Sequence, residues 1–314
     1  MSRTRALFER SPTAWGVGLA LLGAIFFSGK AIVVKLAYAY PVDATTLLAM
    51  RMMLSFPLFL AALVYTIWRN PHSERLEAKD YGLIVIAGLL GYYLASLFDF
   101  MGLQYVTASL ERLILFTYPS LVLLISCLIK HRWPQPWQLL CMALSYMGLA
   151  LVYGHETVLL GDNTALGVLL VFVSAVCYAS YLIVGESLLK RLGTMRVTSL
   201  ATLVSAAAIF LQITLQQQLG QVFEQPLPVW GWSIINAVFC TFVPVFAVMT
   251  AISLIGAPRV SQLGMVGPIS TIVLGTWILD EPFTWWHAAG TALVIAGVAL
   301  LTLKKQTQEE GVQA

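Results

Sequence analysis

Five ionisable side chains lie within stretches of the chain that are otherwise apolar. They are Lys30, Arg51, Asp99, Glu111 and Arg112. A charged side chain at the centre of a bilayer costs about 2.5–3.5 kcal/mol on insertion scales, so such groups usually face a polar interior and have partners. The two acids and three bases leave one positive charge to meet an anionic group. Their types favour ion pairing and small-molecule binding over covalent catalysis.

Each of these charged residues could bind a substrate or a proton, or could instead form an ion pair between helices. We expect Lys30 or Arg51 to bind an anion, and Asp99 or Glu111 to meet an ammonium group or a coupling proton. In the structural alternative, Arg51 forms an ion pair with Glu111 or Asp99, and Asp99 serves as a counter-ion. Lys30 could also extend outward to the membrane surface.

Glu111 and Arg112 are adjacent in the chain. Consecutive residues of a helix point about 100° apart, so both side chains cannot face one cavity squarely. Tyr118 shares a helix face with Glu111 and would extend its polar stripe, which favours Glu111 for the cavity.

Uncharged polar residues and prolines complete the candidate set. Polar side chains can orient a ligand or can equally link helices. The further candidates for substrate contact are Tyr93, Tyr118, Tyr181 and Gln262. Prolines within helices remove a hydrogen bond and permit kinks, so we expect hinges at Pro57, Pro119, Pro244 and Pro268.

The composition is typical of an integral membrane protein. Of 314 residues, 59% are hydrophobic and only 11% charged, whereas a soluble domain has roughly 25% charged residues. The net charge of +3 comes without a basic run interleaved with aromatics, which argues against nucleic acid as a partner. The four cysteines lie in apolar runs without a CxxC pair, so we expect neither disulfides nor zinc. The four histidines fall in or beside predicted loops and form no metal or catalytic set, so we predict no enzyme activity, no metal and no cofactor.

The apolar stretches predict ten membrane-spanning helices, because a span needs roughly 20 mostly apolar residues. The first, which follows three arginines, is longer than the apolar region of a signal peptide, so we expect it to be retained. The predicted spans are 12–37, 44–68, 81–103, 107–129, 136–153, 165–188, 196–217, 229–251, 257–279 and 284–303.

Basic residues predict the orientation, because they concentrate on the cytoplasmic side of membrane proteins. Placing both termini in the cytoplasm, with 1–12 and the polar tail 305–314 inside, leaves the outer loops essentially without basic residues. The inner side then holds Arg3, Arg5, Arg10, Arg69, Arg75, Lys79, Lys130, Arg132, Lys190, Arg191, Arg196, Arg259, Lys304 and Lys305.

The sequence also repeats weakly within itself. A shift of 149 residues takes Ala108 to Ala257, Pro119 to Pro268 and Trp137 to Trp286. This predicts two five-helix units, 13–154 and 164–304. Since five is odd, the second unit must enter the membrane from the opposite side, as in the inverted repeats of many secondary transporters.

These features resemble a known family. The segments GLQYVTASLERLILFTYPSLVLL and AISLIGAPRVSQLGMVGPISTIVLG, with the endings GLALVY and GVALLTL, are similar to EamA-type members of the drug/metabolite transporter superfamily. The resemblance implies a ten-helix inner-membrane carrier working by alternating access, and in many members export of amino acids or related metabolites. Members often carry a Glu after the fourth and ninth helices. Glu281 fits this, but Lys130, His131 and Arg132 stand in the first half.

We therefore expect an all-α secondary transporter of a small polar metabolite that bears a carboxylate. Its partners would be that small molecule, the lipid bilayer and a coupling proton. A passive channel or facilitator is the main alternative, and an intramembrane enzyme is a more remote one. The small residues Ala288, Ala292 and Ala296 on the last helix suggest a scaffold contact or a homodimer contact, so monomer and homodimer both stay open.

Overall fold

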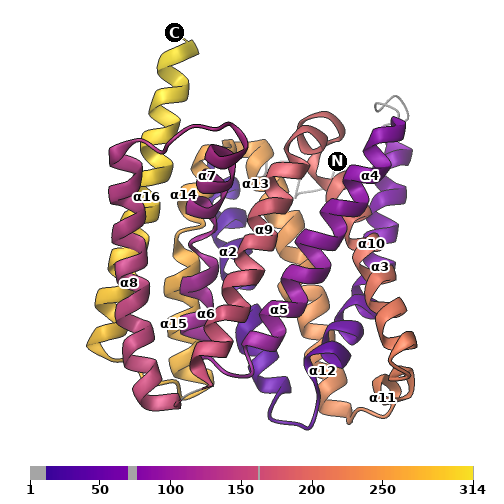
Figure 1. Cartoon of the computed structure of the whole chain (residues 1–314). Coiled ribbons are helices and arrows are strands. Elements are labelled where there is room, and N and C mark those ends of the chain that lie inside the picture. Colours follow the sequence, from indigo (N-terminus) through magenta and orange to yellow (C-terminus); the bar gives the residue numbers. More distant parts are fainter. Residues whose placement is uncertain (1–11, 70–75, 162, 314) are drawn as a thin grey trace.

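The computed structural model describes residues 12–69, 76–161 and 163–313. Every regular element in these ranges is helical, and the helices stand side by side in a bundle (Figure 1). The elements are α2 (Pro12–Ala37), α3 (Ala44–Arg69), α4 (Ala78–Gly88), η1 (Leu89–Leu94), α5 (Ala95–Gly102), α6 (Ala108–Leu115), α7 (Tyr118–Ile129), α8 (Pro136–Leu160), α9 (Thr164–Leu192), α10 (Thr194–Leu215), α11 (Leu219–Phe223), α12 (Leu227–Ala237), η2 (Val238–Phe242), α13 (Val243–Ile255), α14 (Ala257–Leu263), α15 (Val266–Ile278) and α16 (Trp285–Gln313).

Nine stretches of the described chain are long and apolar enough to cross a membrane. The prediction of an all-α, multi-pass membrane protein is confirmed. The remaining predicted span, 257–279, is divided into α14 and α15, with Gly264 and Met265 between them. The spans are Thr13–Ala37, Ala44–Arg69, Ala78–Gly102, Ala108–Ile129, Pro136–Leu159, Thr164–Leu192, Thr194–Leu215, Leu227–Ile255 and Trp285–Leu303.

Two of these spans contain a π-helical segment, and a third is broken. η1 lies between α4 and α5, and η2 between α12 and α13. The chain between α6 and α7 leaves the α-helix at Phe116 and Thr117.

The four prolines occupy two kinds of position. α3 continues through Pro57. Pro119, Pro244 and Pro268 instead lie in the first turns of α7, α13 and α15. At α7 and α15 a proline fits because the first N–H groups of a helix have no intrahelical acceptor. α13 instead continues directly from η2, and Val243 N–H donates to Val238 O.

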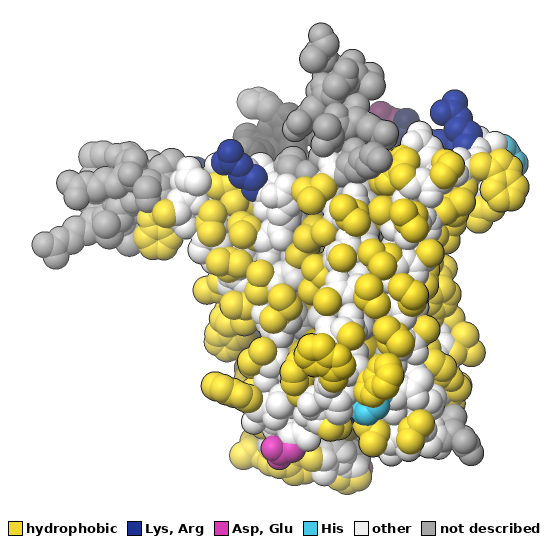
Figure 2. Space-filling model, turned by 90° about the vertical axis from the view of Figure 1, so that its left-hand side faces the viewer, with side chains coloured by type: hydrophobic (Ala, Val, Ile, Leu, Met, Phe, Trp, Pro, Cys, Tyr) yellow, Lys and Arg dark blue, Asp and Glu magenta, His cyan; other side chains and the backbone are white. Residues whose placement is uncertain are grey.

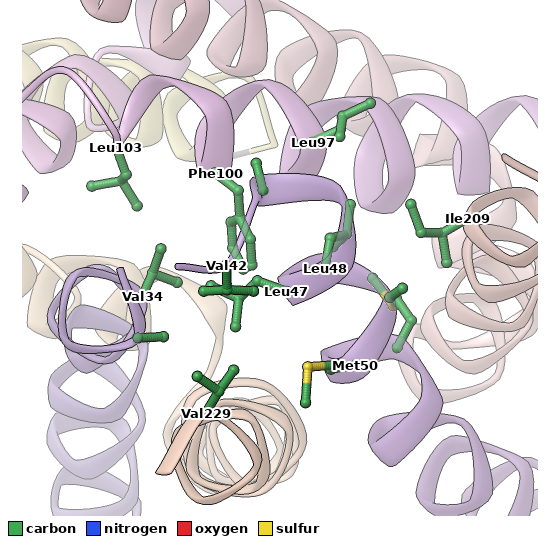
Figure 3. Packing of buried hydrophobic residues seen from close by; sticks show 14 of the residues in the cluster. Val34, Val42, Leu47, Leu48, Met50, Leu97, Phe100, Leu103, Ile209 and Val229 are labelled. Atoms are coloured by element: carbon green, nitrogen blue, oxygen red, sulfur yellow. The ribbon is translucent and has the colours of Figure 1, made fainter. Parts of the chain in front are cut away.

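The largest apolar core joins α2, α3, α5, α10 and α12. Figure 3 shows Phe100 of α5 extending toward Val42 and Leu47, with Val34 and Val229 on neighbouring helices. This core fixes α3 against α5, and these are the helices that carry Arg51 and Asp99.

α8 and α16 pack closely through glycines. A side chain at Gly148 would meet the Gly290 carbonyl oxygen at 2.5 Å, and one at Gly297 would meet the Cys141 carbonyl oxygen at 2.5 Å. The predicted stripe of small residues does not make this contact. Ala288 and Ala292 line an apolar surface groove of about 390 Å³ between α15 and α16.

Polar groups gather at the two ends of the bundle. Figure 2 shows an apolar band, with Lys and Arg at the end where α16 finishes and an acidic residue at the other end. Arg3, Arg5, Arg10 and Arg75, used in predicting the orientation, lie outside the described residues, as do the side chains of Lys304 and Lys305. α16 continues as a helix to Gln313, through most of the segment predicted as a polar tail.

Candidate functional site

Lys30 lies between two carboxylates contributed by different helices. Its Nζ is 2.6 Å from Asp99 Oδ2 and 3.1 Å from Glu111 Oε1. The side chain of Lys30 is 18% exposed, whereas those of Asp99 and Glu111 are 3% and 1% exposed. Three of the five predicted charges thus form one cluster, which joins α2, α5 and α6.

Both acids keep acceptor capacity in this cluster. Asp99 Oδ1 and the two oxygens of Glu111 accept no directed hydrogen bond from the described residues. Buried carboxylates normally have their hydrogen-bonding capacity filled. The cluster therefore has sites that a proton or a ligand donor can occupy.

The second half of the chain supports the Lys30 helix. Ser28 Oγ donates to the backbone oxygen of Gly267 at 2.9 Å, and also to that of Ala24 at 2.7 Å. Thr271 Oγ1 in turn donates to Gly267 O at 3.2 Å. The bond from Ser28 to Gly267 ties α2 to the start of α15, two residues before Lys30.

Arg51 has uncharged partners. It donates from Nη2 to Ser96 Oγ at 2.7 Å, and its guanidinium lies 4.9 Å from the centre of the Phe100 ring. The alternative ion pair with Glu111 or Asp99 is not formed among the described residues.

Glu111 and Arg112 both point into the protein, in different directions. Glu111 turns to Lys30, and Arg112 lies against Gly267 of α15. A side-chain carbon at Gly267 would come within 2.5 Å of Arg112 Nη2, so the guanidinium would have to move from this position.

The tyrosines form a chain of ring contacts. Tyr118 meets Tyr178 edge to face with centroids 5.4 Å apart, Tyr178 lies 5.8 Å from Tyr181, and Tyr181 meets Tyr92 at 5.4 Å. Tyr93 is separate and donates to Gln212 Oε1 at 2.8 Å.

Gln262 has a different environment from the other candidates. It is exposed on the short helix α14, and the structure does not bring it to the buried charge cluster.

The sequence did not predict how α6 is held. Glu281, between α15 and α16, accepts hydrogen bonds from the backbone N–H groups of Ala108 and Ser109, and from Ser109 Oγ at 2.8 Å. Thr107 caps the same helix by accepting from Leu110 N at 3.0 Å. The helix that carries Glu111 and Arg112 is therefore anchored at its N-terminus by an acid from the other half.

The sequence did not predict that Glu156 is buried. α8 extends to Leu160, past the predicted end at 153, and places Glu156 inside the bundle at 1% exposure. Its Oε1 accepts from Thr107 Oγ1 and lies 3.4 Å from His287 Nε2. His155 and His287, predicted in or beside loops, lie within α8 and α16. A helix end cannot be located to better than a few residues from an apolar run.

Neither a three-ligand metal site nor a disulfide is present among the described residues. In the described part of the chain no three His, Cys, Asp or Glu side chains gather in a metal-binding arrangement. The four cysteines, all within the described residues, form no disulfide. The cluster around Lys30 is suited to exchange of ion pairs and protons.

Comparisons with known proteins give a consistent result. The sequence matches the EamA-like transporter family over residues 14–154 and again over residues 165–303. It is 28% identical to "Uncharacterized transporter YcbK" of Bacillus subtilis (strain 168), over 94% of this chain and 96% of that protein. It is 25% identical to "Uncharacterized transporter sll1319" of Synechocystis sp., over 94% and 95%.

A solved crystal structure with 18% identity has the same fold. The TM-score is 0.59, and the match covers 93% of this chain and 99% of that one. Because the family matches extend over most of the sequence, the chain is a membrane transporter that belongs to the EamA-like transporter family.

Proposed function

We propose that this transporter moves a small carboxylate-bearing metabolite, an amino acid or a related compound, out of the cell across the inner membrane by alternating access. The observation that carries the proposal is the buried cluster of Lys30, Asp99 and Glu111. In it, one ammonium lies between two carboxylates, and three of their oxygens accept no directed hydrogen bond from the described residues. Charges within a membrane span mark substrate and ion pathways.

The three charged groups can change partners without leaving a charge unpaired. A substrate carboxylate can bind the ammonium of Lys30, while a substrate ammonium or a proton replaces Lys30 as the partner of Asp99 or Glu111. This provides a route for coupling transport to a proton gradient.

The helix bounds support two repeated units in this mechanism. The shift of 149 residues takes α4 (78–88) onto α12 (227–237), and it takes the first residues of η1, α6 and α8 onto those of η2, α14 and α16. Two units of five spans, 13–154 and 164–304, would be oppositely inserted, with ten spans and both termini in the cytoplasm. Such repeats place the substrate near the membrane midplane, between the halves.

Flux in proteoliposomes tests the site. Lys30→Ala, Arg51→Ala and Glu111→Gln are expected to lower uptake of a labelled amino acid at least about tenfold, as loss of one charged contact does. Lys130→Ala, at an exposed position, serves as the control and should transport normally. Wild-type rates in all three correctly folded site variants would refute the assignment.

A second flux measurement separates a carrier from a passive channel. Unlabelled substrate on the far side of the membrane should accelerate flux through a carrier, because the loaded protein reorients. A channel would show no such acceleration.

A further inference from the structure

Arg112 forms no ion pair within 4 Å among the described residues, although Glu111 is close enough to attract its charge. Lys30 has two acids, and Arg51 has Ser96 and Phe100. Among the described residues, Arg112 takes part in no ion pair and its Nε has no hydrogen-bond acceptor. A buried guanidinium normally has acceptors for its N–H groups, so the bonding capacity of Arg112 is free for a ligand.

Arg112 is also reachable from within the protein. α6 packs against α2, α8, α9, α15 and α16. Its residues from Ala108 to Ile114 are buried, apart from Arg112, which is partly open. Because helices surround α6, this opening faces an internal space.

Tyr178 opens into the interior as well. On α9, the positions Ser174, Tyr181 and Gly185 are buried, and Tyr178 belongs to the same helix face. It is nevertheless 37% exposed. A residue on the buried face that keeps this exposure lines a space between helices.

The two openings lie beside each other. Arg112 is close enough to Glu111, Tyr118 and Tyr178 for electrostatic interaction with all three, and the rings of Tyr118 and Tyr178 are 5.4 Å apart. The space therefore has a guanidinium next to aromatic rings. Aromatic ligands gain about 0.5–1.5 kcal/mol from such rings beyond the area that they bury.

We infer that Arg112, Tyr118 and Tyr178 form a subsite for an organic anion that carries an aromatic ring. Arg112 binds the anionic group, and the tyrosines contact the ring. This inference rests on the proposed function and specifies its substrate class. Gly267 holds the subsite open, because any side chain there would displace the guanidinium.

Binding to the purified full-length protein tests the subsite with three matched probes. Phenylacetate has the anion and the ring, cyclohexylacetate lacks the aromatic ring, and 2-phenylethanol lacks the charge. Phenylacetate should bind about two- to tenfold more tightly than cyclohexylacetate and at least about tenfold more tightly than 2-phenylethanol.

Variants should remove these two preferences separately. Arg112→Gln should lose the preference for the anion, and Tyr178→Leu should lose only the preference for the aromatic ring. Gly267→Ala should weaken phenylacetate binding through displacement of Arg112. Arg132→Gln, at an exposed arginine, is the control and should bind as wild type does.

Three results overturn the inference: wild-type protein that binds none of the probes, equal affinity for phenylacetate and cyclohexylacetate, or unchanged binding in Arg112→Gln. If Arg112→Gln is unfolded, Arg112→Lys replaces it; this variant keeps the charge and should bind phenylacetate more weakly than wild type. Failure here leaves the flux results for Lys30 and Glu111 intact. Failure of the proposed function appears instead as normal flux in those variants.

Discussion

Glu281 Oε1 accepts a hydrogen bond of 2.6 Å from the backbone N–H of Ala108, the first residue of α6. The carboxylate belongs to the second half of the chain and the helix to the first. Amides in the first turn of a helix have no intrahelical acceptor and carry the positive end of the helix dipole. Glu281 thus joins the two halves at the helix that bears Glu111 and Arg112.

Removing the charge of Glu281 should destabilise the protein. We expect Glu281→Gln to lower the free energy of unfolding by about 1–2 kcal/mol, because a partly buried anion at a helix N-terminus is lost. Thermal unfolding in detergent measures this. The neighbouring Asp280 is exposed, so Asp280→Asn should stay within about 0.5 kcal/mol of wild type. Equal effects of the two substitutions would contradict the role of Glu281.

The pair of Lys30 and Asp99 should show strong energetic coupling. Lys30→Met leaves two buried carboxylates without a cation, which costs about 3–5 kcal/mol for a buried pair. Asp99→Asn in the same protein removes one of the stranded charges, so the double variant should be more stable than the sum of the single effects predicts. Unfolding of all four proteins in the cycle gives the coupling energy. Additive effects would show that the contact between Lys30 and Asp99 is energetically unimportant.

Gly148 should be far less tolerant of a side chain than Gly154 on the same helix. An added methyl group at Gly148 would meet the Gly290 oxygen at 2.5 Å, while at Gly154 nothing lies within 4 Å. Gly148→Ala should therefore cost about 1–3 kcal/mol through overpacking of α8 on α16. Gly154→Ala should be neutral or stabilising, since alanine favours the helix. Comparison of the two midpoints of thermal unfolding tests this.

Acid should loosen the N-terminus of α4. Lys79, first through its hydrogen bond and then through its charge, and Arg191 hold the pKa of Glu77 below its usual value of 4.5. A lowered folded-state pKa gives stability that is present above the usual value and is lost as the pH falls through the folded value. Hydrogen-exchange protection of the first turn of α4 should fall over that window.

The matched variants separate Glu77 from general acid effects. In Glu77→Gln, protection should already be reduced at neutral pH, and the further loss in acid should be smaller than in wild type, because only Asp80, which accepts from the backbone N–H of residue 77, still titrates at this turn. Glu224→Gln alters an exposed acid near α11 and should leave protection at α4 as it is in wild type. A wild-type pH profile in Glu77→Gln would argue against this anchor.

The sequence predicts which charged residues are candidates for the site, but not which partners they contact. Charge within apolar runs identified Lys30, Asp99 and Glu111, because lipid rejects an unshielded charge whatever the fold. The pattern did not show that Lys30 serves both acids, nor that Arg51 turns to Ser96 and Phe100. Glu281 was noticed only as part of a family pattern, since its partners are backbone amides 172 and 173 residues away.

The sequence by itself determined the class of protein, the positions of nine spans and the spacing of 149 residues between corresponding segments, because these depend on composition and on apolar length along the chain. Only the tertiary structure decided which helix faces meet. A helix that is apolar on all sides carries little periodic signal of its packing face. The ion pairs of Lys30 and the cap on α6 both depend on contacts between such faces.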